Sequence, residues 1–238
     1  MGEEEVVSAY WQQKYRREAP KWWNLFYRRN QTRFFKDRHW TQREFPEIQE
    51  GMTLLELGCG VGNFILPLVQ EVKLRRAWVC DFAPDAIELL ERDERFSKDL
   101  ITAFVADVSQ PDALSLITEP VDLVASIFVL SAIPPESLLT VVQNVLKVLR
   151  PDGLWIIRDY AVGDAAAGRF SRERKLGENL FVRQDGTLAR FFAEEEIKLI
   201  LNIWFEVECQ VIQGRTSNRA KGIDHERLFL QVKARRKI

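Results

Sequence analysis

Residues 52–63 read MTLLELGCGVGN, a short apolar run that ends in a loop with three glycines spaced G-x-G-x-G. An apolar run that leads into a glycine-rich turn and then a helix is typical of the first strand of a parallel α/β sheet. Glycine suits such a loop because the backbone must approach a ligand closely. A dinucleotide fingerprint G-x-G-x-x-G would place its third glycine at position 63, which is Asn63 here. The sequence therefore predicts a ligand-binding loop at residues 58–62 that departs from the dinucleotide type.

Apolar and helical segments alternate from this loop to residue 160. Besides the run at 52–57, apolar runs predict strands at 77–82, 101–108, 121–130 and 154–160. Helices are predicted between them at about 63–71, from Pro84 onward and at 136–149, and a Pro-Asp-Gly turn is predicted at 151–153. Near-continuous apolar strands separated by helices indicate a parallel sheet covered on both faces.

The end of the chain has a different pattern. Residues 161–192 are rich in Gly, Arg and polar residues and are too long for an ordinary connection, so we expect a functional insert there. A predicted helix at 193–202 leads to strands at 204–212 and 227–234, with a basic loop between the strands. Two strands without a helix between them predict an antiparallel pair at the sheet edge. The expected fold is α/β, with a seven-stranded, mostly parallel sheet and an antiparallel edge strand.

Composition excludes several classes of protein. The chain has 238 residues, of which 46% are hydrophobic and 29% charged, so disorder is excluded. No apolar run approaches the roughly 20 residues that span a bilayer, and the N-terminus has no apolar signal-peptide core. Three scattered cysteines are too few for a disulfide framework or a zinc site, and no metal is expected. We expect a cytoplasmic or nuclear protein without a membrane partner.

The first 50 residues form an aromatic and basic leader. Trp22, Trp23, Phe26 and Tyr27 recur on one helical face, so the leader should pack on the rest of the chain. Residues 11–43 hold ten Lys and Arg against two acidic residues, and residues 214–238 hold eight against two. Since the net charge is −1, the remainder carries −15. A basic head and tail suit an anionic partner, although solvated helical faces would look the same.

Acidic residues follow the glycine loop at informative distances. Asp81 closes the second strand, 19 residues after Gly62, where it can accept hydrogen bonds from ribose hydroxyls. Asp107 and Val108 close the third strand, where a carboxylate and a backbone amide can bind an adenine. Together with the final strand pair, this combination is similar to the class I (Rossmann-like) S-adenosylmethionine (SAM)-dependent methyltransferases. The alternatives are a nicotinamide dehydrogenase, which Asn63 disfavours, and a catalytically inactive relative.

The resemblance implies which residues bind SAM. From the loop and the strand ends these are Gly58, Gly60, Gly62, Asp81, Asp107, Val108 and Ile127. Ile127 and Phe128, at the end of the fourth strand, can wall the adenine and open towards the substrate. The bound cofactor should lie beyond the carboxyl ends of the strands.

The segments around the expected cofactor site bear on the substrate. An N6-adenine methyltransferase carries an Asn/Asp-Pro-Pro-aromatic tetrad after strand four, but residues 127–131 read IFVLS and the tetrad is absent. The distinctive segments are FFKDRHW (34–40), IFVLSA (127–132), RDY (158–160), KLGEN (175–179) and VRQDGT (182–187). They resemble the eukaryotic tRNA 3-methylcytidine methyltransferases, which modify cytidine 32 of the anticodon loop. The resemblance covers about residues 20–235, and the KDRHW, KLGEN and VRQDGT motifs are most similar to those of the serine-tRNA subgroup.

This resemblance implies an organisation and partners. Residues 1–50 would be a cofactor lid and RNA-binding extension, with Trp23 and Tyr27 contacting SAM. Residues 51–238 would be the methyltransferase domain, with a substrate-binding insert at about 161–192. Serine tRNA would be the substrate and seryl-tRNA synthetase a partner, and the absence of heptads favours a monomer. One departure is Leu188, where the family commonly has an arginine; Arg190 could compensate.

A mechanism follows from the chemistry of cytosine. The N3 lone pair is already nucleophilic, so catalysis should be mostly positioning. Methylation leaves a cationic base, which a carboxylate could stabilise; Asp159 is the first candidate and Asp185 the second. The structural alternatives are that Asp159 pairs with Arg158 or with a helix N-terminus, and that Asp185 shapes an Asp-Gly turn.

The target base must also leave its stack to reach the methyl group. The side chains expected to stack on it are Tyr160, Phe128 and Phe35. Those expected to hold phosphates are Arg158, Arg183, Lys36 and Arg38. Other substrates left open are another RNA, a protein side chain or a small metabolite, and the non-enzymatic alternative is an RNA-binding subunit that retains the fold.

Overall fold

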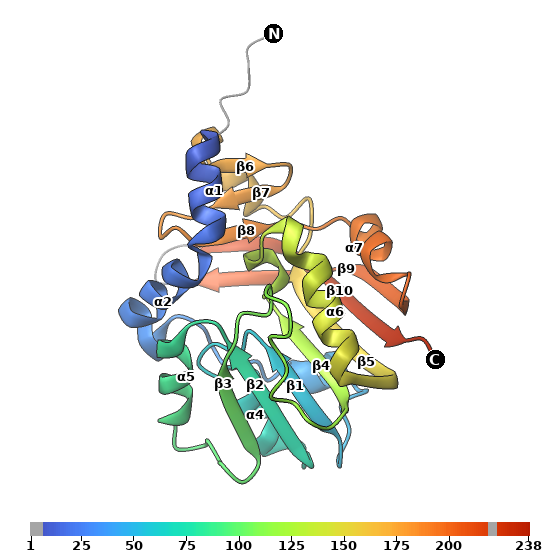
Figure 1. Ribbon diagram of the computed structural model, residues 1–238. Helices are drawn as coiled ribbons and strands as arrows, with labels where there is room; N and C mark the ends of the chain where they lie inside the picture. Colours follow the sequence, from blue (N-terminus) through green and yellow to red (C-terminus); the bar gives the residue numbers. More distant parts are fainter. Residues whose placement is uncertain (1–6, 219–222) are drawn as a thin grey trace.

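A seven-stranded sheet forms the centre of the protein (Figure 1). The computed structural model describes residues 7–218 and 223–238. The strand order is β3-β2-β1-β4-β5-β10-β9, and β1 to β5 are parallel while β10 is antiparallel to both of its neighbours. The strands are β1 (Thr53–Leu57), β2 (Arg76–Asp81), β3 (Ile101–Val105), β4 (Val121–Ile127), β5 (Leu149–Tyr160), β9 (Phe205–Asn218) and β10 (Ile223–Arg236). The expected mostly parallel α/β sheet with an antiparallel strand in its edge pair is confirmed.

Helices cover both faces of this sheet because successive strand residues point to opposite sides. Leu54 and Leu55 on β1, for example, enter two different apolar clusters. One cluster includes side chains of α6 (Leu138–Val148) and α7 (Glu194–Leu201), and the other includes side chains of α4 (Ile65–Glu71) and α5 (Pro84–Glu91). None of the helices in the described part of the chain is long and apolar enough to span a membrane.

The order of the strands places a ligand site at the carboxyl end of β1 and β4. The chain runs outward from β1 to β3 and then returns to β4 on the other side of β1. Loops after β1 and β4 therefore diverge at this point, which is where open α/β sheets bind ligands. The glycine loop follows β1, and Phe128 follows β4.

The leader and the insert pack together above this end of the sheet (Figure 1). The leader consists of α1 (Ala9–Arg17), α2 (Ala19–Asn30), a 3₁₀ turn (Gln31–Arg33) and α3 (Thr41–Glu44). The insert forms a separate three-stranded sheet from β6 (Lys175–Gly177), β7 (Leu180–Val182) and β8 (Leu188–Arg190). Val7 and Tyr15 pack against the apolar side of that small sheet. The expected insert is thus an ordered subdomain in contact with the leader.

Several boundaries differ from those expected from the sequence. β3 ends at Val105 rather than at residue 108, so Asp107 and Val108 lie in the segment that follows the strand. The basic loop expected between 212 and 227 is wrong, because β9 and β10 continue as paired strands to Asn218 and from Ile223; Arg219 and Lys221 of that segment lie outside the described residues. The turn expected at 151–153 is an irregularity within β5, with Asp152 at φ +59°. β4 ends at Ile127 because Phe128 adopts φ +61°.

Candidate active site

The first two glycines of the loop bound a cavity. Gly60 has φ +53°, and a Cβ there would lie 2.5 Å from the Tyr27 hydroxyl. Gly58 has φ +60°, and a Cβ there would overlap the side chain of Val129. Gly62 differs, because a Cβ at that position would meet Leu66 and Leu90 in the core. Gly58 and Gly60 line the cavities described below, whereas Gly62 lines neither of them and has a packing position.

Asp81, at the end of β2, fixes the shape of this loop. Its side chain is buried, and it accepts hydrogen bonds from the backbone N–H groups of Gly60 (2.9 Å) and Ala83 (2.9 Å). Burial raises the pKa of Asp81 to about 6, although both hydrogen bonds oppose the rise. Asp81 also lines the cavity, so one carboxylate both holds the loop and faces the ligand space.

A narrow cavity at this point gathers most of the residues expected to bind the cofactor. Its lining includes Trp23, Tyr27, Gly58, Asp81, Asp107 and Val108. Asp107 uses Oδ1 to accept hydrogen bonds from the backbone N–H (3.0 Å) and hydroxyl (2.6 Å) of Ser109, which leaves Oδ2 for a ligand. These residues are brought together from the leader and from three strand ends, as an adenosine site requires.

A larger cavity of about 520 Å³ adjoins the narrow one and contains Glu56 and Arg38. Glu56 is 3% exposed, and its Oε2 is buried without a hydrogen-bond partner in the described part of the chain. Burial raises the pKa of Glu56, and the positive charge of Arg38 opposes this. Arg38 was expected on a phosphate, but its guanidinium lies 4.9 Å over the Phe128 ring inside the cavity.

These groups fit the amino-acid end of SAM. An unpartnered buried carboxylate oxygen is suited to an ammonium group, and a guanidinium is suited to a carboxylate. The indole N–H of Trp23, which lines both cavities, is also buried and has no partner among the described residues. Glu56 and Arg38 would therefore hold the amino acid of the cofactor, while Asp81 and Asp107 would hold its nucleoside.

Phe128 separates the cofactor end from the substrate end. It lines both cavities and adopts φ +61°, an uncommon conformation that its backbone N–H supports by donating to the Arg158 carbonyl (2.7 Å). Its ring lies 5.1 Å from that of Tyr160 and 5.4 Å from that of Phe229. Ile127 lines only the larger cavity. The strained residue thus places an aromatic wall between the two spaces.

The insert supplies Asp185 and Arg183 to the larger cavity. Asp185 accepts with Oδ1 from the backbone N–H (3.0 Å) and hydroxyl (2.7 Å) of Thr187, which is the hydrogen-bonded turn anticipated as its structural alternative. The other carboxylate oxygen remains for a ligand. A Cβ at Gly186 (φ +88°) would overlap Trp22, so the leader closes directly over this turn.

Two residues expected to touch the substrate are buried instead. Asp159 is fully buried, and it accepts hydrogen bonds from the backbone N–H groups of Ser131 (2.9 Å) and Tyr160 (2.9 Å). Burial raises its pKa to about 6. It does not line the cavity, whereas Ser131 and Tyr160 do, so its position fits a positioning residue rather than one in contact with the base.

Arg158 is likewise unsuited to the phosphate contact expected for it. It is 4% exposed, its guanidinium donates to Glu44 and Gln231, and it stacks 4.3 Å from the Trp40 ring. Arg190, suggested as a replacement for the missing arginine at 188, is also engaged, with Glu196. Phe35 lines the cavity, and Lys36 is exposed on the leader.

Sequence reasoning missed a second arginine of the substrate end. Arg227 lines the larger cavity, and its Nε donates to both carboxylate oxygens of the buried Asp164 (3.0 and 2.9 Å). Its guanidinium lies 5.4 Å over the Tyr160 ring, which Arg183 also approaches at 5.8 Å. The sequence predicts that Arg227 begins a strand. The one signal for its direction is that Arg227 and Phe229, two residues apart, share a face of that strand.

No group of three or more His, Cys, Asp or Glu side chains is arranged to hold a metal ion within residues 7–218 and 223–238. The site instead offers carboxylates, guanidinium groups and aromatic rings.

Comparison with known proteins shows the family of this chain. A family model described as a methyltransferase domain matches residues 27–203. The tRNA N(3)-cytidine methyltransferase METTL6 of Rattus norvegicus is 44% identical over 97% of this chain and 84% of its own length. The tRNA N(3)-methylcytidine methyltransferase trm141 of Schizosaccharomyces pombe is 38% identical over 94% of this chain and 95% of its own. A Saccharomyces cerevisiae tRNA(Thr) (cytosine(32)-N(3))-methyltransferase is 36% identical over 92% of this chain and 37% of its own.

Solved structures share the fold. A SAM-dependent methyltransferase from Anabaena variabilis superposes with a TM-score of 0.70 at 15% identity, covering 92% of this chain and 95% of that one. The N-methyltransferase NodS from Bradyrhizobium japonicum, solved with S-adenosylhomocysteine, gives 0.56 at 22% identity over 82% of each chain. The fold, the family model over most of the chain and the level of identity to the curated relatives together establish that this chain is a SAM-dependent methyltransferase and belongs to the tRNA N3-cytidine methyltransferase family.

Proposed function

We propose that this protein transfers a methyl group from SAM to N3 of cytidine 32 in the anticodon loop of serine tRNA. The observation that carries the proposal is the larger cavity, which joins the cofactor end to an aromatic and guanidinium-lined substrate end across Phe128. The names of the relatives supply N3 of cytidine and, in the budding-yeast protein, position 32. The serine assignment rests on the resemblance of KLGEN (175–179) and VRQDGT (182–187).

The substrate end is suited to a single flipped-out pyrimidine. Tyr160 and Phe128 present ring faces 5.1 Å apart between centroids at an angle of 37°, and Phe191 adds a third ring 5.7 Å from Tyr160. A base that has left its stack gains about 1–3 kcal/mol by stacking on such a platform. SAM supplies an electrophilic methyl group, so the task of these side chains is to hold cytosine N3 in line with it.

Asp185 is the carboxylate best placed to contact the base. Its Oδ1 is engaged with Thr187, and its remaining oxygen can accept a hydrogen bond from the exocyclic amine of cytosine. A carboxylate also stabilises the positive charge that the base gains on methylation. Uracil has a carbonyl in place of that amine, so the same contact discriminates against it.

Arg183 and Arg227 are suited to the phosphates that flank the flipped-out nucleotide. Asp164 holds Arg227 through Nε, which leaves the two Nη groups of its planar fork for a phosphate. Both guanidinium groups approach the ring of Tyr160, so backbone contacts and base stacking would be formed together. Lys36, exposed on the leader, would add a phosphate contact outside the cavity.

The proposal assigns roles to the larger parts of the chain. The leader up to residue 50 is the cofactor lid and RNA-binding extension, and the insert at 161–192 binds the substrate. Seryl-tRNA synthetase is the proposed partner, and the methyltransferase is proposed to be a cytoplasmic or nuclear monomer.

Methyl transfer to unmodified transcripts tests the substrate. Purified protein and SAM are incubated with serine, threonine and arginine tRNAs, each with and without the cognate synthetase, and nucleosides are measured by mass spectrometry. The proposal expects 3-methylcytidine in serine tRNA and a higher yield with seryl-tRNA synthetase. Product in threonine or arginine tRNA alone would overturn the serine assignment.

A further inference from the structure

Residues 34–40, here called the strap, connect the leader helices to the catalytic sheet. The strap lies between the 3₁₀ turn and α3, and it has no regular secondary structure of its own. It nevertheless carries Arg38 into the cavity beside Glu56, and it places Phe35 on the cavity wall. Contacts outside regular structure must therefore hold these side chains in place.

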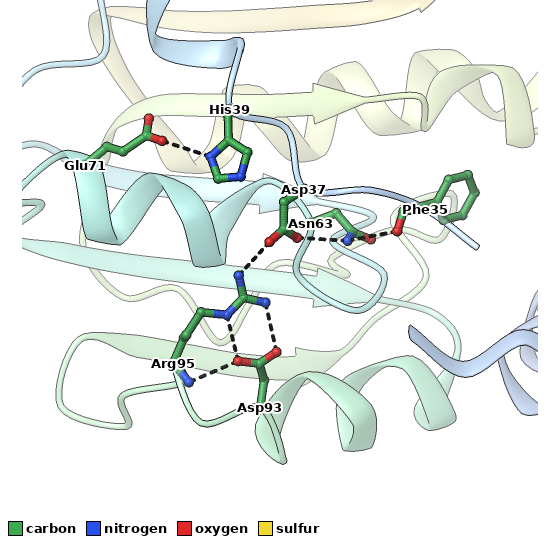
Figure 2. Close-up of polar contacts among 7 residues, drawn as sticks. All are labelled: Phe35, Asp37, His39, Asn63, Glu71, Asp93 and Arg95. Atoms are coloured by element: carbon green, nitrogen blue, oxygen red, sulfur yellow. Dashed lines mark hydrogen bonds and ion pairs between the residues drawn. The ribbon is translucent and has the colours of Figure 1, made fainter. Parts of the chain in front are cut away.

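Asn63 provides the first set of contacts (Figure 2). Its side-chain amide donates to Asp37 Oδ1 (3.1 Å) and towards the Phe35 carbonyl (3.5 Å), and the backbone carbonyl of Asn63 accepts from the Arg38 backbone N–H (2.8 Å). Asn63 directly follows Gly62 of the cofactor loop. The residue that breaks the dinucleotide fingerprint is thus the residue that joins the strap to the cofactor loop.

Arg95 provides the second set of contacts from the segment after α5 (Figure 2). It donates through Nη1 to Asp37 Oδ2 (2.6 Å) and through Nε and Nη2 to the two oxygens of Asp93 (2.8 and 2.9 Å). The carboxylate of Asp93 raises the pKa of Arg95 and fixes its guanidinium plane. Asp37 therefore joins a pre-oriented guanidinium on one side to the cofactor loop on the other.

The partial exposure of the Asp37–Arg95 ion pair indicates that the pair positions the strap more than it stabilises the fold. The side chains of Asp37 and Arg95 are 27% and 26% exposed, and such ion pairs contribute only about 0–1 kcal/mol to stability. His39 and Glu71 add a more exposed contact (3.1 Å) at the far end of the strap. Removing Asp37 should therefore release the strap without unfolding the protein.

We propose that Asp37 is a positioning residue that fixes Arg38 in the cofactor cavity and, through Asn63 and Arg95, couples cofactor binding to RNA binding. The coupling to RNA rests on the proposed function; the effect on the cofactor does not. The physical basis is that one element, the strap, contacts the cofactor loop through Asn63, places Phe35 on the wall of the larger cavity and exposes Lys36. A ligand that orders a shared element lowers the entropic cost of ordering it for the second ligand.

Calorimetric titration with S-adenosylhomocysteine tests the first half without RNA. We expect Asp37→Ala and Arg38→Ala each to weaken binding by about tenfold, the loss typical of one charge-assisted hydrogen bond. Since Asp37 acts through Arg38, the double variant should bind within about twofold of Arg38→Ala. Independent losses that multiply in the double variant, or wild-type binding by Asp37→Ala, would overturn the proposal.

The same titration with and without serine tRNA tests the coupling. We expect tRNA to tighten S-adenosylhomocysteine binding to the wild type by about 5- to 20-fold, within the usual range of coupling between sites. In Asp37→Ala this ratio should fall to nearly 1. An unchanged ratio in Asp37→Ala would contradict the coupling. Failure of the wild type to bind any tRNA would instead count against the proposed function and the coupling together, and the double-variant result would still stand.

Two controls separate positioning from general damage. Asp112→Asn removes a carboxylate from an exposed ion pair with Lys147 (2.6 Å) and should leave both binding constants and the ratio unchanged. Asp37→Asn keeps an oxygen for Asn63 but turns an amide towards Arg95, so an intermediate loss is expected. The thermal midpoint of unfolding should change by less than about 4 °C in each variant. If Asp37→Ala shifts the midpoint by more than this, Asp37→Asn takes its place in both titrations. Wild-type affinity and a wild-type ratio in Asp37→Asn would overturn the role of Arg95.

Discussion

The cofactor end and the substrate end of the cavity are built in different ways. At the cofactor end, consecutive strand ends supply the glycine loop, Asp81 and Asp107 within 50 residues of chain. At the substrate end, Tyr160, Asp185 and Arg227 come from β5, the insert and β10, and they meet only in the folded protein. The backbone geometry of neighbouring strand ends therefore forms the cofactor site, whereas packing between distant segments of the chain forms the substrate site.

Two buried carboxylates show the same contrast on a smaller scale. Glu56 has an oxygen without a partner, and it lines the larger cavity. Asp159 uses both oxygens for backbone N–H groups and does not reach the cavity. Burial raises the pKa of both, so burial alone cannot tell a ligand-binding carboxylate from a structural one.

The largest effect should come from closing the backbone cradle at the cofactor end. Gly60→Ala places a methyl group 2.5 Å from the Tyr27 hydroxyl at a residue with φ +53°. We expect at least about a 100-fold loss of S-adenosylhomocysteine affinity, from strain and from displacement of Tyr27. Gly168→Ala is the matched control, because a Cβ there meets nothing within 4 Å. Calorimetry measures both affinities. Wild-type affinity in Gly60→Ala would contradict the claim that the cofactor site depends on the backbone at Gly60.

A pair of carboxylate variants sharpens the comparison at the substrate end. Asp185→Asn should lower kcat by about 10- to 100-fold with little change in the unfolding midpoint, because it removes charge from the cavity. Asp159→Asn should lower the free energy of unfolding by about 1–3 kcal/mol, because a buried N–H loses its acceptor. Steady-state kinetics and urea unfolding of both variants decide the roles. An exchange of the two phenotypes would return Asp159 to direct contact with the base.

A smaller effect is expected from the tertiary arginine contact. Arg227→Ala should raise the KM for tRNA about tenfold and reduce the slope of log K against log salt by about 1, while S-adenosylhomocysteine affinity stays unchanged. Asp164→Asn should reproduce part of the KM effect, since Asp164 orients the guanidinium. Fluorescence anisotropy of labelled tRNA over a salt series measures the slope. An unchanged slope in Arg227→Ala would exclude a phosphate contact.

A further prediction concerns the pH dependence of stability. Burial raises the pKa of Asp159 to about 6, above the value of about 3.9 in an unfolded chain. The folded state therefore binds this proton more tightly, so the contribution of Asp159 to the free energy of unfolding falls as pH rises from about 4 to 6 and is constant above. The asparagine of Asp159→Asn does not titrate. The difference in the free energy of unfolding between the wild type and Asp159→Asn should therefore shrink as the pH rises from about 4 to 6. Urea unfolding at pH 4, 5, 6 and 7 measures it; a difference that grows with pH would contradict the assignment.

The sequence predicted most of the residues that line the narrow cavity because their determinants are local. Glycine spacing and the distance from Gly62 to Asp81 reflect one strand-loop-helix unit and the next strand. The same pattern left the role of Glu56 open, since whether its second oxygen has a partner depends on the leader. It also could not show that Gly62 packs on Leu90 rather than facing the cavity.

The substrate end was predicted less well because strand register is not encoded locally. The antiparallel pair β9/β10 was expected, but the sequence did not show the register of β10 on β5, which places Gln231 opposite Arg158 and Leu230 opposite Asp159. Arg158 and Asp159 are both buried, so Tyr160 is the residue of the RDY segment that lines the cavity. β10 also brings Arg227, which the sequence places only at the start of a strand, to the larger cavity.

Mapping the modified nucleotide tests the central claim most directly. Serine tRNA and its C32U variant are methylated, digested with a base-specific ribonuclease, and the fragments are sequenced by mass spectrometry. We expect one methyl group, at N3 of cytidine 32. We expect no product in the C32U variant, because uracil lacks the exocyclic amine that donates a hydrogen bond to Asp185. Methylation of another nucleotide, or equal product from the C32U variant, would contradict the claim that this cavity holds cytidine 32 against the cofactor.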